Sequence, residues 1–249
     1  MSLPRRIGST YSRIWQTYRA WAPSLLLLAV VVFGPLALLD AMTMNVELDS
    51  LDLTNGIKVA ALALAVGAIT ATGLIGEVFF SGAIAISLTH PHGEDPPPLR
   101  EIARRLNYGR LIAVDLVYVV LVAVGLLLGI VPGLLVFVWF GLAGPVVELE
   151  ERTARGALAR SMRLVRGNFW LVLWVLLPIQ VLGDGIGHLL GALVHDLFGH
   201  TFLATWLAEA VTDIALSPIF AVAAVLLTLD LMREKEGGAP PLHSAPLPA

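Results

Sequence analysis

The chain contains no cysteine, and this absence excludes several chemistries at once. It can form no disulfide, no thiolate metal site and no cysteine nucleophile. Charge is also scarce, because charged residues make up 14% of the chain, against about 25% in a typical soluble domain. Hydrophobic residues make up 57%, so the composition excludes an ordinary soluble globular protein. The net charge of −3 gives no support for a nucleic-acid partner.

In place of charge, the chain has a series of apolar runs near 20 residues long. Such runs are long enough to cross the roughly 30 Å core of a bilayer. We predict an all-α, polytopic integral membrane protein with six transmembrane helices, at 23–43, 58–87, 111–130, 132–147, 168–187 and 206–230. The first run is expected to stay as an anchor, since no small-residue cleavage site follows it. Residues 1–236 are predicted to form one membrane domain, and 237–249 a disordered tail rich in Pro and Gly.

Basic residues are nearly absent from one side of this predicted arrangement. Fifteen of the sixteen Lys and Arg residues fall on the same side, and Lys58 is the exception. Under the positive-inside rule, the basic side is cytoplasmic. We therefore expect a multi-pass protein of the inner or plasma membrane with both termini in the cytoplasm.

The arginine clusters before the odd-numbered spans also have helical periodicity. In the segment 11–21, Ile14 and Trp15 lie on an apolar face and Arg13 lies on the opposite, polar face. The segments 99–106 and 152–167 repeat the pattern. We predict three basic amphipathic helices at the inner interface, each followed by a membrane hairpin, in units of roughly 9–88, 97–147 and 152–231. These units are interpreted as pseudo-repeats, although the needs of any inner-leaflet helix would produce the same pattern.

The arginines of these helices are candidates for binding anionic lipid headgroups. Near a negatively charged leaflet, each basic side chain contributes on the order of 1 kcal/mol. The alternative is that they only fix topology and extend their charged ends to the interface. The candidates are Arg13, Arg19, Arg100, Arg104, Arg105, Arg160, Arg163 and Arg166.

Acidic residues inside the predicted spans form a second group of candidates. They are Glu77, Asp115, Glu209 and Asp213. A carboxylate facing lipid costs several kcal/mol, so we expect these side chains to face the bundle or a wet cavity. They could form a cation or proton path, or they could pack as polar groups and pair with an arginine such as Arg110.

The connection between spans five and six carries the one concentration of His and carboxylate residues, namely Asp184, His188, His195, Asp196 and His200. Residues four apart in this set would share a face if the segment is helical. A divalent metal site on the outer face is chemically possible. No H-E-x-x-H motif is present, so we expect structural or pH-responsive histidines and no bound metal or cofactor.

Glycine marks two further places in the chain. Gly183, Gly187 and Gly191 recur every four residues, and on a helix they would form a smooth strip for close contact with a neighbour. A flexible outer loop is the alternative for that segment. Pro132 and Gly133 are expected to end span three and turn the chain into span four.

The stretch from Gly129 to Pro178 has a more specific pattern. It contains a Pro-Gly turn, a span, a Pro followed by Glu, an A-L-x-x-S-x-x-L-V-x-G helix, and a Trp that opens the next span. The residues that carry it are Pro132, Gly133, Pro145, Glu148, Ala157, Leu158, Ser161, Leu164, Val165, Gly167 and Trp170. This stretch resembles the membrane domain of glycerophosphodiester phosphodiesterase-type proteins and related small bacterial families.

The resemblance implies an architecture more than an activity. In such proteins the hydrolase is a separate soluble barrel, and after the sixth span about 18 residues remain here, so we do not expect the phosphodiesterase activity. What the resemblance implies is a membrane domain that handles or senses lipid. In it, Pro145 would bend the inner end of span four, Gly167 would end the amphipathic helix, and Trp170 would anchor the interface.

These observations favour a non-enzymatic membrane module that organises or senses lipids or partner proteins at the cytoplasmic face. The expected partners are anionic headgroups, other membrane proteins or a second copy of the chain. A small transporter or lipid-handling protein that uses the buried carboxylates is the alternative. An intramembrane hydrolase is a further one, because Glu150 to Arg155 matches the E-E-x-x-x-R pattern of CPBP-type proteases, but their F-x-x-x-H motif is absent.

Overall fold

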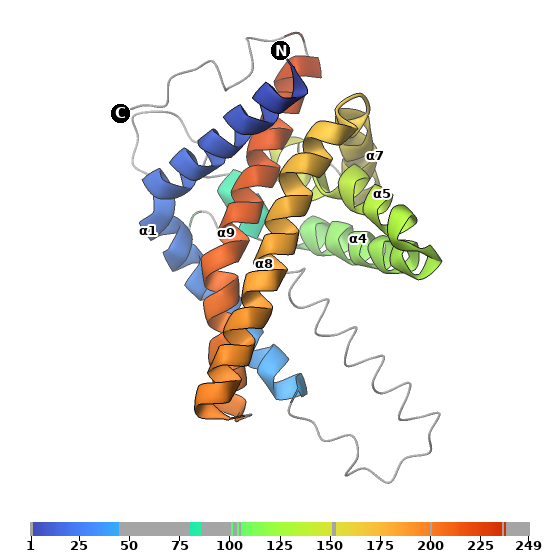
Figure 1. Cartoon of the computed structure of the whole chain (residues 1–249). Helices are drawn as coiled ribbons and strands as arrows, with labels where there is room; N and C mark the ends of the chain where they lie inside the picture. The colour runs from blue at the N-terminus through green and yellow to red at the C-terminus, as the bar shows by residue number, and fades with distance from the viewer. Residues whose placement is uncertain are drawn as a thin grey trace.

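The computed structural model describes residues 2–44, 80–85, 101, 104, 106–150, 153–199, 201–235 and 237. Within these residues all regular structure is helical. The helices are α1 (Leu3–Met44), α4 (Tyr108–Leu128), α5 (Ile130–Phe140), α6 (Ala143–Glu150), α7 (Ala154–Val165), α8 (Phe169–Phe198) and α9 (Phe202–Lys235), as Figure 1 shows, and residues 80–85 are also helical. The prediction of an all-α fold is therefore confirmed for the described part of the chain.

Five described segments are long and apolar enough to cross a membrane, as expected of a membrane-embedded protein. They are Leu3–Pro35, Tyr108–Leu128, Ile130–Glu150, Phe169–Phe198 and Phe202–Lys235, and they correspond to predicted spans one, three, four, five and six. Predicted span two lies outside the described residues except for 80–85. The count of six spans and the three repeated units therefore stay predictions.

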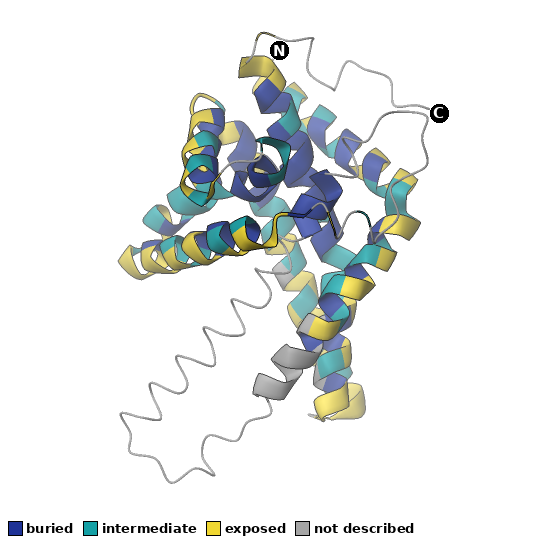
Figure 2. Cartoon of the chain, turned by 180° about the vertical axis from the view of Figure 1, so that it is seen from behind, coloured by how far each residue is buried: buried dark blue, intermediate teal, exposed yellow. Residues whose placement is uncertain are grey.

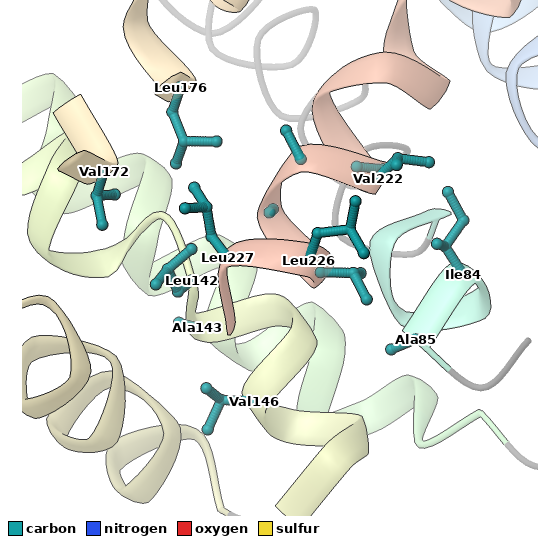
Figure 3. Close-up of a cluster of buried hydrophobic side chains, with 14 of the residues drawn as sticks. Ile84, Ala85, Leu142, Ala143, Val146, Val172, Leu176, Val222, Leu226 and Leu227 are labelled. Carbon is teal, nitrogen blue, oxygen red and sulfur yellow. The ribbon is translucent and has the colours of Figure 1, made fainter. Parts of the chain in front are cut away.

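Helix α9 is the central element of the fold. α1 and α8 pack along it, and Figure 1 shows the three helices side by side. All residues from 221 to 228 are buried, and Figure 3 shows Val222, Leu226 and Leu227 of α9 in one cluster with side chains of α6, α8 and the 80–85 segment. Burial is concentrated toward the end where α1 begins and α9 ends, whereas much of α4 and the far ends of α8 and α9 are exposed (Figure 2).

Helices α4 and α5 form a hairpin that projects to one side of α8 and α9 (Figure 1). The predicted turn between spans three and four is confirmed, but it lies at Gly129, whose φ of 137° favours glycine. Pro132 and Gly133 instead lie in the first turn of α5, where a missing N–H is tolerated. The tip of the hairpin is apolar and exposed, with Leu127 at 87%, as expected of a surface that contacts lipid.

Predicted span four is interrupted near its inner end. The α-helix stops at Phe140, Gly141 and Leu142 form a turn, and α6 begins at Ala143. Pro145 explains the interruption, because it has no N–H to donate to the carbonyl of Gly141 and its ring crowds that carbonyl. The bend predicted at Pro145 is therefore present, one turn earlier in the chain than the proline itself.

The predicted boundary between the first amphipathic helix and span one is not a break in the helix. α1 runs without interruption for 42 residues and contains Pro23 and Pro35. Figure 1 shows that α1 changes direction about halfway along its length. A proline inside a helix removes one hydrogen bond and kinks the axis, so we attribute the change of direction to Pro23.

The segment between predicted spans five and six is helical. α8 continues to Phe198, and it ends at Gly199, which has a φ of 71°. Of the glycine strip, only Gly187 makes a close contact: a Cβ placed there would lie 2.7 Å from Cγ2 of Thr212 on α9, whereas Gly183 and Gly191 have nothing within 4 Å. Of the three glycines, Gly187 alone is therefore a point of close packing between α8 and α9.

We expect Gly187→Ala to lower the free energy of unfolding by about 1–3 kcal/mol, the usual range for overpacking. Thr212 cannot easily move away, because its hydroxyl donates a 2.8 Å hydrogen bond to the carbonyl of Ala208. Gly191→Ala is the matched control on the same helix and should be neutral or stabilising by up to about 1 kcal/mol. The measurement is unfolding by SDS in mixed micelles, and equal effects of the two variants would contradict the prediction.

Candidate functional site

The start of α1, the end of α7 and the end of α9 meet at one end of the bundle. Arg6 of α1 pairs with Glu234 of α9 at 2.7 Å and donates to the Oδ1 of Asn168, ahead of α8, at 3.0 Å. The Nζ of Lys235 donates to the carbonyls of Arg163 and Arg166 at 2.7 and 2.8 Å. A cation is favoured there, because the last carbonyls of a helix carry partial negative charge. We call this end of the molecule, which carries Arg6, Arg163, Arg166 and Lys235, the basic end.

The α7 helix is amphipathic, and its apolar arc packs against the bundle. Leu158, Leu164 and Val165 are buried, while Met162 is exposed. Thr153 caps the start of the helix by accepting a hydrogen bond from the N–H of Gly156, and Gly167, with a φ of 93°, follows its end as predicted. Because the apolar arc is covered by protein, the polar arc faces outward.

Four of the eight predicted headgroup arginines are exposed in the structure, and they are Arg19, Arg104, Arg163 and Arg166. Further basic side chains that are exposed are Arg5, Arg155, Arg233 and Lys235. Arg160 is mostly buried and pairs with Glu150 at 2.7 Å. Arg100 and Arg105 lie outside the described residues.

Arg13 is the predicted headgroup residue that the structure places elsewhere. It is 8% exposed, and its Nη1 lies 2.7 Å from Oδ2 of Asp230 on α9, which is also buried. A buried cation next to a carboxylate is held by that pair and does not reach a lipid headgroup. The assignment of Arg13 to lipid binding was therefore wrong; it joins α1 to α9.

The faces of the first amphipathic segment also differ from the prediction. The side of α1 that packs on the bundle carries Thr10, Arg13, Ile14 and Thr17, all buried, at the i, i+3, i+4, i+7 spacing of one helical stripe. Trp15, predicted on the apolar face, is 55% exposed. The stripe of α1 that packs on the bundle is therefore the one that contains Arg13, the partner of Asp230. The more aromatic face with Trp15 is not the buried one.

Asp115 is the predicted intramembrane acid that the structure buries most clearly. It is 1% exposed, and neither carboxylate oxygen has a hydrogen-bond partner within the described part of the chain. Asp213 of α9 is half-buried. Glu77 and the side chain of Glu209 lie outside the described residues, so the path predicted for the four acids stays a prediction.

A cavity of about 30 Å³ lies beside the buried face of α4. It is partly open and is lined by residues of α4, α5, α6, α9 and the 80–85 segment, and by Gly141. Val114 and Tyr118 of α4 line it, together with Ser81, Gly141 and Pro145. The lining thus combines two hydroxyl groups with the backbone at the interruption of predicted span four.

The described members of the predicted His and Asp cluster do not converge. In α8, His188 and Asp196 are exposed and His195 is half-buried, and the side chain of Asp184 and residue His200 are outside the description. Positions 188 and 195 are two helical turns apart, about 10 Å along the axis, whereas zinc binds nitrogen at about 2 Å. Among the described residues no group of His, Asp and Glu has the arrangement of a metal site.

No family model, curated protein or solved structure matches this chain. The resemblance of Gly129 to Pro178 to a phosphodiesterase-associated membrane domain therefore stays a prediction.

Asp230 and Glu234, the partners of the α1 arginines, were not predicted from the sequence. A signal was present for Asp230, because it is a lone acid in the apolar run L-L-T-L-D-L-M, and such a residue needs an opposite charge. A matching signal was the stripe from Thr10 to Thr17, on which Arg13 is the one charged side chain.

Proposed function

We propose that this protein is a non-enzymatic membrane module whose basic end gathers anionic lipid headgroups at the cytoplasmic face. The observation that carries the proposal is the orientation of α7. Its apolar arc packs on the bundle, so that Arg155, Arg163 and Arg166 are exposed. Lys235, at the end of α9, contacts the end of the same helix, so basic residues from two distant segments gather there.

The charge of this end fits an anionic surface. Each arginine near a negatively charged leaflet contributes on the order of 1 kcal/mol, which corresponds to about a fivefold change in a binding equilibrium. The contacts of Arg6 and Lys235 hold the ends of α1, α7 and α9 together. The backbone that carries the exposed arginines of α7 is therefore held in place before lipid binds, which limits the conformational entropy lost on binding.

The test uses the protein reconstituted into vesicles of phosphatidylcholine and phosphatidylglycerol, with a spin label on either lipid. We expect the immobilised lipid at the protein to be enriched in phosphatidylglycerol. Arg155→Gln, Arg163→Gln and Arg166→Gln together should lower that enrichment at least about fivefold. High salt should lower it in the wild-type protein as well, because exposed charges are screened.

Arg160→Gln is the matched control for the headgroup experiment. It removes the same charge from the same helix, but Arg160 already pairs with Glu150, so the lipid preference should hardly change. If the triple variant keeps the wild-type preference, the proposal is wrong. If it does so and also loses a partner protein in pull-downs from its own membranes, the basic end recognises protein and not lipid.

A further inference from the structure

Asp115 differs from the other well-buried charged side chains that the structure describes. Arg13 and Asp230 neutralise each other at 2.7 Å. Asp115, on the membrane-crossing helix α4, has two buried oxygens that meet no donor in the described part of the chain. An ionised carboxylate left alone in such a place is strongly unfavourable. A charged Asp115 is therefore unfavourable within the part of the chain that the structure describes, and a neutral form is favoured.

None of the described charged or titratable groups around α4 forms a hydrogen bond with Asp115. α5 has none, and α6 contributes Glu148 and Glu150. α9 reaches the cavity through Phe220 and Ala224, and its charged residues are Glu209, Asp213, Asp230, Arg233, Glu234 and Lys235. α7 carries Arg155, Arg160 and Arg163. α4 itself carries Arg110, Tyr108 and Tyr118. Neither oxygen of Asp115 has a hydrogen bond to any of these groups.

The same geometry decides between the cations that could bind. A metal ion such as Ca²⁺ or Mg²⁺ requires about six oxygen ligands around it, and no second polar group of the described chain reaches the carboxylate of Asp115. A proton needs only one oxygen and leaves a neutral acid, which is the form that a buried site favours. The chemistry of the site therefore selects a proton.

A cavity lies beside the buried stripe of α4 that carries Asp115, although Asp115 itself is not among its lining residues. Leu111, Val114, Asp115 and Tyr118 form one buried stripe of α4, and Val114 and Tyr118 from this stripe line the cavity. Its volume of about 30 Å³ exceeds the roughly 10–15 Å³ that one water molecule requires. Two residues that carry a hydroxyl, Ser81 and Tyr118, are among those that line it, and Pro145 has no N–H to offer the carbonyl of Gly141.

We propose that Asp115 is a proton-binding site within the membrane, which holds a carboxylic acid and exchanges its proton with water in the neighbouring cavity. In the release step the O–H bond of the acid breaks and the proton joins a water oxygen, which gives a carboxylate and a hydronium ion. Uptake is the reverse step. Proton binding at Asp115 does not involve the residues of the basic end and does not depend on headgroup binding. Either proposal can therefore fail without the other.

The experiment is infrared spectroscopy of the full chain in phosphatidylcholine vesicles at neutral pH. We expect a carbonyl band of a protonated carboxylic acid that shifts in D₂O and is lost in Asp115→Asn. Glu234→Gln is the control and should keep the band, because Glu234 is an exposed partner of Arg6. Asn has the size and neutrality of the protonated acid, so we expect this variant to fold.

A second measurement does not depend on any variant. Labelling the wild-type protein with carboxyl-¹³C aspartate should shift the band, whereas the corresponding glutamate label should not. The absence of a protonated-acid band in the wild-type protein, or a band that persists unchanged in folded Asp115→Asn, would overturn the proposal. A band that moves with the glutamate label would overturn it as well, because the proton would then lie on another residue.

Discussion

Replacing Asp230 with asparagine should lower the free energy of unfolding by about 3–5 kcal/mol, the range found when one partner of a buried ion pair is removed. The change leaves the guanidinium of Arg13 buried without a carboxylate, because the Nη1 of Arg13 has Oδ2 of Asp230 at 2.7 Å. We expect the variant to unfold at a lower SDS fraction than the wild-type protein in mixed micelles. Tryptophan fluorescence measures the unfolding.

Two controls separate this effect from a general loss of charge. Glu234→Gln removes the half-exposed partner of Arg6 and should cost less than about 1 kcal/mol. The double variant Arg13→Met with Asp230→Leu removes both charges and should recover most of the lost stability, since apolar pairs often replace buried ion pairs without loss. If Asp230→Asn and Glu234→Gln lower the free energy of unfolding equally, the buried pair contributes no more to stability than the exposed pair, and the prediction is wrong.

Replacing Gly125 with alanine should destabilise the α4–α5 hairpin by about 1–3 kcal/mol, and a valine there should cost more. A Cβ on Gly125 would lie 2.9 Å from the Cα of Gly133 and 3.0 Å from its nitrogen. These are backbone atoms, so no rotation of a side chain relieves the contact. The two helices would have to separate, and they are joined by a turn of one residue, Gly129.

Gly109→Ala is the matched control for the hairpin prediction. It lies on the same helix, and a Cβ there has nothing within 4 Å, so it should be neutral or stabilising by up to about 1 kcal/mol. The hairpin can be followed by the quenching of Trp139, which lies on α5, by a lipid-borne quencher. A Gly125→Ala protein as stable as the Gly109→Ala protein would show that the helices adjust without cost.

The helical class and the positions of the apolar helices followed from the sequence because hydropathy reports contact with lipid directly. The helix end at Gly167 was equally readable, and a turn between spans three and four was readable to within a few residues, since glycine and proline act through their own backbone restrictions. The turn lies at Gly129 and not at Pro132 and Gly133 as predicted. The joining of the first amphipathic segment to span one was not readable. It depends on α9, which lies about 200 residues further along the chain and covers the stripe around Arg13.

The candidate site was predictable in part for the same reason. The exposure of Arg163 and Arg166 was predictable because an amphipathic pattern fixes which arc of a short helix is polar. Arg13 was misplaced because periodicity shows which residues share a face, but it does not show which face a distant helix will cover. Asp115 was found from its apolar surroundings, whereas the cavity beside it depends on Pro145 and on four other segments.

The contacts of Arg6 and Arg13 join the first and last described helices across 228 and 217 positions of the chain. During synthesis, α1 enters the membrane long before α9 leaves the ribosome, and Arg13 has no carboxylate from α9 in that interval. The bundle can therefore close only after its last helix has been inserted. A nascent chain arrested before α9 should remain bound to the insertion machinery, and crosslinking at position 13 would report the moment of release.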